Sequence, residues 1–155
     1  MAEVYSLVYK PHDENAAGHY TRVPLESARL VVGHGIEGDL NGKGNPNRQL
    51  NVMSYETLTS LSGEGFKTKP GEMGEQITLR GLDINGLEVG TRVQLGDQAV
   101  IEVIKPRTGC DRFEAIQGHA RNEAAGRLGV MARVVTEGLV RVNDPVKVLE
   151  TVSAK

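Results

Sequence analysis

The stretch RVQLGDQAVIEVI, residues 92–104, predicts two short strands joined by a tight turn. Apolar and polar side chains alternate before the turn, with Val93 and Leu95 on one face, as in a half-buried strand. The turn contains a glycine followed by an aspartate, and both residue types are common in tight turns. The apolar run after the turn predicts a returning strand. This stretch therefore indicates a fold made of short β-strands.

Similar strand-like segments recur along the chain and are separated by turns that contain glycine. They are residues 4–9, 27–32, 49–53, 76–80, 130–135, 139–142 and 146–149, and residues 136–138 predict a second hairpin. Glycine makes up 19 of the 155 residues, whereas aromatic residues are only 4%. Short strands with frequent glycine turns favour an antiparallel barrel or sandwich over βαβ units.

One short helix interrupts the strands. Tyr55, Leu58 and Leu61 fall at three-residue spacing, which predicts a helix with one apolar face. Ser54 is a suitable N-cap, and the glycines soon after Leu61 end the helix. A further helical turn is expected within residues 121–127.

The composition limits the classes of function. The chain of 155 residues and 16.7 kDa fits one domain, residues 1–155, and its 39% hydrophobic residues can form a core. A net charge of −2 argues against a basic nucleic-acid surface and a polybasic membrane surface. No apolar run approaches the ~18 residues of a membrane span, and the N-terminus lacks a secretory signal. We therefore expect a cytoplasmic protein that binds neither nucleic acid nor membrane.

Residues 33–51 form a polar run, rich in glycine and without periodicity. Loops of this length are usually functional or disordered. Backbone N–H groups of the run, together with Lys43 and Arg48, are suited to cradle an anionic group such as a phosphate. A solvated surface loop is the alternative.

The single cysteine, Cys110, follows the predicted strand 99–104 and lies between Arg107 and Arg112. Two cations favour the thiolate, the form that attacks electrophiles or binds soft metals, whereas Asp111 opposes it. One cysteine excludes an internal disulfide and a Cys-rich zinc site. On the residues alone, the alternative that Cys110 is a small buried hydrophobic residue stays open.

Residues 70–76 place two glycines around acidic side chains, which predicts a bent approach to the strand at 76–80. Glu75 is a candidate acid–base group or a partner for a cation. An exposed turn charge is the alternative. The four histidines are scattered along the chain and show no zinc-ligand spacing.

These three segments, together with several others in the same order, resemble the MOSC domain family. That family is found at the C-terminus of molybdenum-cofactor sulfurases and as free-standing bacterial proteins. The resemblance covers about residues 27–150, and its motifs are Gly35-Ile36-Glu37-Gly38-Asp39, Arg48-Gln49-Leu50-Asn51, Gly74-Glu75-Gln76-Ile77-Thr78, Gly81-Leu82-Asp83, Gly90-Thr91-Arg92, Leu95-Gly96-Asp97, Pro106-Arg107, Cys110 and Val140-Arg141-Val142-Asn143-Asp144-Pro145-Val146.

The resemblance implies a mainly β fold, a closed β-barrel with a few short helices. It also implies a molybdopterin-type molybdenum cofactor, with Cys110 as the molybdenum ligand and catalytic residue. Basic and amide side chains would contact the phosphate and pterin of this cofactor. The residues that the resemblance assigns to these contacts are Arg48 first, then Asn51, Lys43, Glu75, Arg107 and Arg133. For each of them, a structural salt bridge or turn contact is the alternative.

The implied activity is two-electron reduction of N-hydroxylated or N-oxide substrates, with electrons from a separate reductase. One alternative is a sulfur carrier that receives a persulfide on Cys110 from a cysteine desulfurase and passes it to metal–sulfur cofactor assembly. Another is a non-catalytic carrier of the cofactor. Many family members have histidine where this chain has Asn41. Because asparagine cannot donate a proton near neutral pH, activity is reduced or altered if that histidine protonates the substrate. If the histidine only orients a loop, asparagine suffices.

Overall fold

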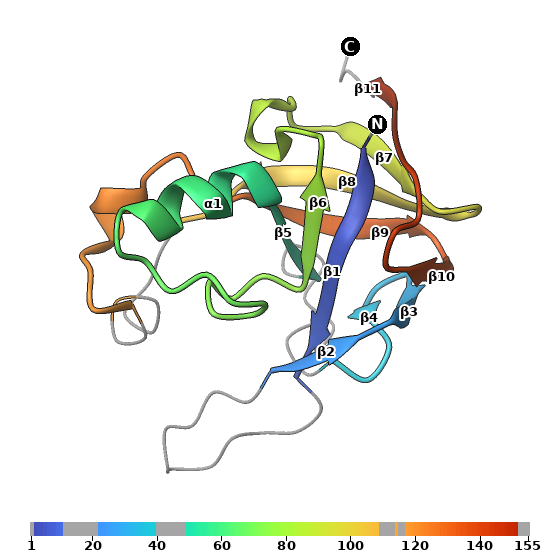
Figure 1. The fold of residues 1–155 in the computed structure, drawn as a ribbon. Helices are drawn as coiled ribbons and strands as arrows, with labels where there is room; N and C mark the ends of the chain where they lie inside the picture. The colour runs from blue at the N-terminus through green and yellow to red at the C-terminus, as the bar shows by residue number, and fades with distance from the viewer. Residues whose placement is uncertain (1, 11–21, 40–48, 109–113, 115–116, 152–155) are drawn as a thin grey trace.

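The computed structural model of the chain describes residues 2–10, 22–39, 49–108, 114 and 117–151 (Figure 1). Strands dominate these residues, so the predicted mainly β fold is confirmed. The elements in chain order are β1 (Glu3–Tyr9), β2 (Val23–Leu25), β3 (Ser27–Val31), β4 (Gly35–Ile36), β5 (Leu50–Ser54), α1 (Tyr55–Gly63), β6 (Ile77–Arg80), the 3₁₀ helix η1 (Ile84–Gly86), β7 (Thr91–Leu95), β8 (Ala99–Pro106), the 3₁₀ helix η2 (Arg121–Ala124), β9 (Val130–Thr136), β10 (Gly138–Arg141) and β11 (Val146–Thr151).

The larger sheet has eight strands in the order β11-β7-β8-β9-β5-β6-β1-β2. The predicted hairpin at residues 92–104 is confirmed, because β7 pairs antiparallel with β8. The expectation of purely antiparallel pairing is wrong at one place, where β5 pairs parallel with β6. There α1 lies in the connection between the two strands and returns the chain to the same end of the sheet, as a βαβ crossover does.

The smaller sheet has the order β10-β3-β4 and corrects the second predicted hairpin. β9 and β10 are consecutive in the chain, but β9 pairs with β8 and β5, whereas β10 pairs with β3. Glu137, between them, binds β3 and the residue after it: one oxygen lies 3.5 Å from the guanidinium of Arg29, and the other accepts the N–H of Val32 at 3.4 Å. The chain therefore changes sheets at this turn.

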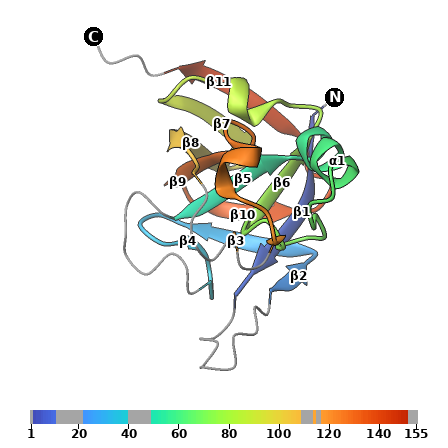
Figure 2. The same cartoon turned by 90° about the vertical axis from the view of Figure 1, so that its left-hand side faces the viewer.

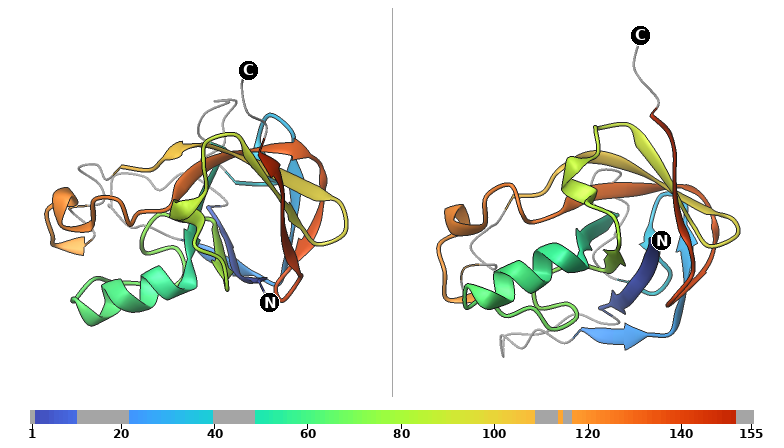
Figure 3. Two further views of the ribbon diagram at one scale, coloured as in Figure 1. Left: turned by 90° about the horizontal axis from the view of Figure 1, so that it is seen from above. Right: turned by 45° about the horizontal axis from the view of Figure 1, so that its top comes forward.

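The two sheets curl around a common core (Figures 1 and 3). Within the described residues, no strand ladder joins β11 to β2, which are the two ends of the larger sheet. Individual backbone hydrogen bonds instead join β1 to the segment between β10 and β11. The N–H of Val4 donates to the carbonyl of Asp144 at 2.9 Å, and the N–H of Asn143 donates to the carbonyl of Val4 at 2.7 Å. Closure into a barrel therefore stays a prediction.

A second, smaller core lies beneath α1. Leu58 and Leu61 are buried, so the predicted apolar face of the helix is confirmed. This cluster joins α1 to the segment that follows η2, and both project from the same side of the sheet (Figures 1 and 2). Its members are Met53, Leu58, Leu61, Phe66, Met73, Ala124 and Leu128. The helical turn predicted within residues 121–127 is η2.

Ser54 occupies the N-cap position of α1, as predicted, but its side chain does not cap the helix. Its hydroxyl donates to the carbonyl of Leu82 at 2.6 Å and accepts the N–H of Ile84 at 2.8 Å. The start of α1 is thereby bonded to the loop after β6. Among the described residues, none of the helices combines the length and apolar character needed to cross a membrane.

Candidate functional site

A buried polar network lies where the parallel strands β5 and β6 begin. The N–H of Asn51 donates to Oε1 of Gln76 at 2.7 Å, and the N–H of Gln76 donates to the carbonyl of Asn51 at 2.9 Å. The side-chain amide of Gln76 also donates to Asp39 at 3.2 Å. Asp39 is fully buried and accepts the N–H of Lys10 at 2.8 Å. Hydrogen bonds among buried groups fix a single arrangement, so four distant segments meet here in defined positions.

Glu75 lies next to this network and is 1% exposed, which excludes an exposed turn charge. One carboxylate oxygen accepts the N–H of Gly71 at 2.8 Å, and the other accepts the N–H of Met73 at 3.1 Å. Burial raises the pKa of Glu75, whereas these hydrogen bonds and the charge of Arg107 act in the opposite direction. The carboxylate therefore holds the loop at residues 70–75 in shape.

Arg107 follows β8 and reaches the same loop. Its N–H donates to the carbonyl of Gly129 at 3.0 Å, which fixes the backbone where β8 ends. Its guanidinium lies against Gly74, so closely that a Cβ atom at Gly74 would collide with it. The side-chain amide of Asn51 donates to the carbonyl of Gly74 at 3.1 Å. The fold therefore brings Asn51, Glu75 and Arg107 together around Gly74, although Asn51 and Arg107 are far apart in sequence.

Arg133 lies elsewhere. It is exposed on β9, and its guanidinium is 3.3 Å from Glu102, which also binds Arg92 at 3.2 Å. These contacts match the structural salt bridge that was the alternative for Arg133, and a role in cofactor binding stays a prediction. The other residues singled out in the sequence fall outside the described residues; they are Asn41, Lys43, Arg48, Cys110, Asp111 and Arg112.

Sequence reasoning did not single out Asp39 and Gln76 as site residues. Both belong to motifs that carry the resemblance, and each adjoins a motif residue of interest, Gly38 or Glu75. A polar residue beside a motif residue of interest was the available signal. Both side chains are buried, with 0% of Asp39 and 1% of Gln76 exposed, and the hydrogen bond between them joins positions 37 residues apart, which a local pattern does not contain.

Two hollows lie beside α1. A cleft of about 810 Å³ opens between α1, the loop after β6 and the loop before β9, and Glu56, Glu64, Asp83 and Arg127 are its charged lining residues. A smaller hollow of about 280 Å³ lies between β1, α1 and β6, and Glu75 is among its lining residues. Tyr5 and Tyr55, whose ring centroids are 4.3 Å apart, also line it.

Comparison with known proteins gives one family and several similar structures. The model of the MOSC domain family matches residues 39–147. The fold is similar to YuaD from Bacillus subtilis, at 17% identity and a TM-score of 0.78, over 96% of each chain. It is also similar to YiiM from Geobacillus stearothermophilus, at 20% identity and a TM-score of 0.73, over 97% of this chain and 76% of that one. YiiM from Escherichia coli gives 21% identity and a TM-score of 0.73, over 99% of this chain and 72% of that one. No curated protein matches the sequence.

Proposed function

Because the chain belongs to the MOSC domain family, we propose that it binds a molybdopterin-type molybdenum cofactor and reduces N-hydroxylated or N-oxide substrates. The observation that carries the proposal is the convergence of Asn51, Glu75 and Arg107 around Gly74. These residues belong to three motifs that are widely separated in the sequence, and each was expected to serve the cofactor.

The donor set around Gly74 fits a phosphate-bearing pterin. The planar guanidinium of Arg107 suits bidentate contacts with phosphate oxygens or a pterin edge. The amide nitrogen of Asn51 is held by the carbonyl of Gly74, so this hydrogen bond orients its amide oxygen, which can accept an N–H of the pterin. Arg48 and Lys43, in the polar run of residues 33–51, would complete the phosphate contacts.

Glu75 stabilises the loop on which this site is built. Its carboxylate oxygens are bonded to the N–H groups of Gly71 and Met73, so it positions the loop that Arg107 and Asn51 contact. Glu75 was expected to bond the pterin directly, and these contacts favour a positioning role. In the proposed site, Cys110 is the molybdenum ligand, because a thiolate suits this soft centre. When bound, the cofactor supplies two-electron redox chemistry, and a separate reductase provides the electrons.

The test is the metal and sulfur content of the protein made in a host that synthesises the cofactor. We expect molybdenum in the wild type and its loss in Cys110→Ser. Equal molybdenum content in both proteins would remove the metal-ligand assignment. An additional sulfur mass on Cys110 in protein free of pterin would favour the sulfur carrier fed by a cysteine desulfurase. Tight cofactor binding with no turnover of hydroxylamines by any electron donor would favour the cofactor carrier.

A further inference from the structure

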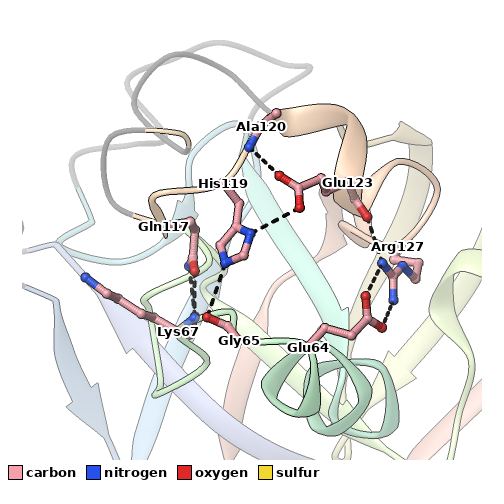
Figure 4. Close-up of polar contacts among 8 residues, drawn as sticks. All are labelled: Glu64, Gly65, Lys67, Gln117, His119, Ala120, Glu123 and Arg127. Carbon is pink, nitrogen blue, oxygen red and sulfur yellow. Dashed lines mark hydrogen bonds and ion pairs between the residues drawn. The ribbon is translucent and has the colours of Figure 1, made fainter.

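His119 bridges two segments that are far apart in sequence (Figure 4). Its Nδ1 lies 3.2 Å from Oε1 of Glu123, and its Nε2 lies 3.3 Å from the carbonyl oxygen of Gly65. The ring of Phe66 stacks on the imidazole, with centroids 4.3 Å apart and planes inclined by 20°. Two contacts of His119 therefore reach the loop that follows α1, and one reaches η2.

Both atoms that face the imidazole nitrogens are acceptors. A carboxylate oxygen and a backbone carbonyl oxygen carry no proton, so each hydrogen bond needs a proton on the ring nitrogen. A neutral imidazole has one N–H and can make only one of the two bonds. The imidazolium has two and makes both. Both hydrogen bonds of His119 therefore form together only when the ring is positively charged.

The surrounding contacts join the same two segments. Gln117 exchanges hydrogen bonds with the backbone of Lys67, at 2.6 and 2.8 Å. Arg127 donates to both carboxylate oxygens of Glu64 and to the carbonyl of Glu123 (Figure 4). None of these groups needs to change its protonation between pH 5 and 8. His119 is thus the contact in this set that responds to pH in that range.

Charged side chains approach His119 from both of the segments that it joins. Glu123 contacts the ring directly, and this hydrogen bond lowers the pKa of Glu123. From the α1 side, Glu64 is neutralised by its ion pair with Arg127, and Lys67 points its side chain away from the ring (Figure 4). The side chain of Arg121 lies outside the described part of the structure.

We propose that His119 is a pH-sensitive clasp that holds residues 117–128 against the end of α1. In its charged form it binds Gly65 and Glu123 together, and in its neutral form one of these bonds is lost. Glu64 and Arg127 line the cleft of about 810 Å³, so the clasp also holds the wall of that cleft. Loss of the clasp loosens this wall.

The sign of the pH dependence follows from both partners. The hydrogen bond with His119 lowers the pKa of Glu123 from its ordinary value of 4.5. Above about pH 4.5 the carboxylate of Glu123 therefore accepts the hydrogen bond from the imidazole, and it loses this ability as the pH falls through the lowered pKa. Histidine side chains lose their charge within the range of roughly pH 5 to 8. The clasp is therefore tightest in mildly acidic solution and weakens as the pH rises.

Amide hydrogen exchange of Ala120 tests the clasp, because its N–H donates to Oε2 of Glu123 at 2.8 Å. After correction for the chemical exchange rate, protection of this amide in the wild type should fall roughly two- to tenfold between about pH 6 and pH 8, the factor for one net hydrogen bond. In His119→Gln, protection should be low at both pH values. The matched variant His34→Gln should behave like the wild type.

Equal protection of Ala120 at both pH values in the wild type, or the same fall in His119→Gln, would overturn the proposal. A second measurement on the wild type needs no variant. The carboxyl carbon of Glu123 should shift in step with the imidazole of His119 during an NMR titration. Two independent titration curves would refute the clasp even if His119→Gln fails to fold.

Discussion

Replacement of Gly129 by alanine should destabilise the protein strongly. Gly129 has φ +79°, and left-handed backbone at a residue with a Cβ costs about 1–2 kcal/mol. The added Cβ would also collide with the carbonyl of Val52 and lie 2.8 Å from Cγ of Met53. Because the first obstacle is the backbone of the central strand β5, it cannot rotate away, and overpacking of this kind costs about 1–3 kcal/mol. The free energy of unfolding should therefore fall by roughly 2–5 kcal/mol in total.

The matched control is Gly126→Ala. Gly126 has φ +78°, but nothing lies within 4 Å of the position of its Cβ, so only the backbone cost of about 1–2 kcal/mol applies. Urea unfolding of both variants and the wild type measures the difference. Gly129→Ala should also weaken cofactor binding, because the Gly129 carbonyl holds the N–H of Arg107. Equal unfolding free energies for the two variants would refute the close approach of Gly129 to β5.

Two further predictions concern the loop at residues 70–75. Gly74→Ala should lower the free energy of unfolding about as much as Gly33→Ala, because the φ angles of the two glycines are +83° and +81° and the obstacle at Gly74 is the movable end of the Arg107 side chain. Only Gly74→Ala should lower the pterin content of the protein. Equal pterin content in the two variants would contradict this prediction. Because burial raises the pKa of Glu75, the folded protein keeps this proton at pH values where the unfolded chain has lost it, so the free energy of unfolding falls across that range. The difference in unfolding free energy between the wild type and Glu75→Gln should therefore fall as the pH rises from 4.5 through the raised pKa. Urea unfolding of both proteins at several pH values measures this difference. A difference that does not vary with pH would count against the burial of this charge.

Local patterns predicted most of the elements but missed the short strands β2 and β4, and they predicted the strand partners less well. The hairpin at residues 92–104 has a strand period, a turn and a return within one short stretch, and it formed as expected. β5 and β6 were each predicted as strands, but their parallel pairing depends on how α1, between them in the chain, packs through Leu58 and Leu61. β10 was assigned to the wrong partner, because the contacts of Glu137 with β3 come from a segment about a hundred residues earlier.

In the candidate site, too, the residues could be named from the sequence, but their arrangement in space could not. The resemblance named Asn51, Glu75 and Arg107, but no spacing in the sequence places them around one glycine. That arrangement results from the register of β5 with β6 and from the end of β8. The clasp at His119 had no signal in the sequence, since its partner Gly65 lies 54 residues away. The scattered histidines show no zinc-ligand spacing, and their positions gave no information about a single bridging histidine.

The pterin content of purified Arg107→Gln, measured beside the wild type, tests the central claim most directly. Arg29→Gln is the matched control, because Arg29 forms a surface ion pair with Glu137 and lies outside the site. All three proteins would be made in a host that synthesises the cofactor, with pterin and molybdenum quantified per chain. We predict cofactor in the wild type and in Arg29→Gln, and a loss of most of it in Arg107→Gln. Equal content in all three proteins, or none in the wild type, would contradict the assignment of this site to the cofactor.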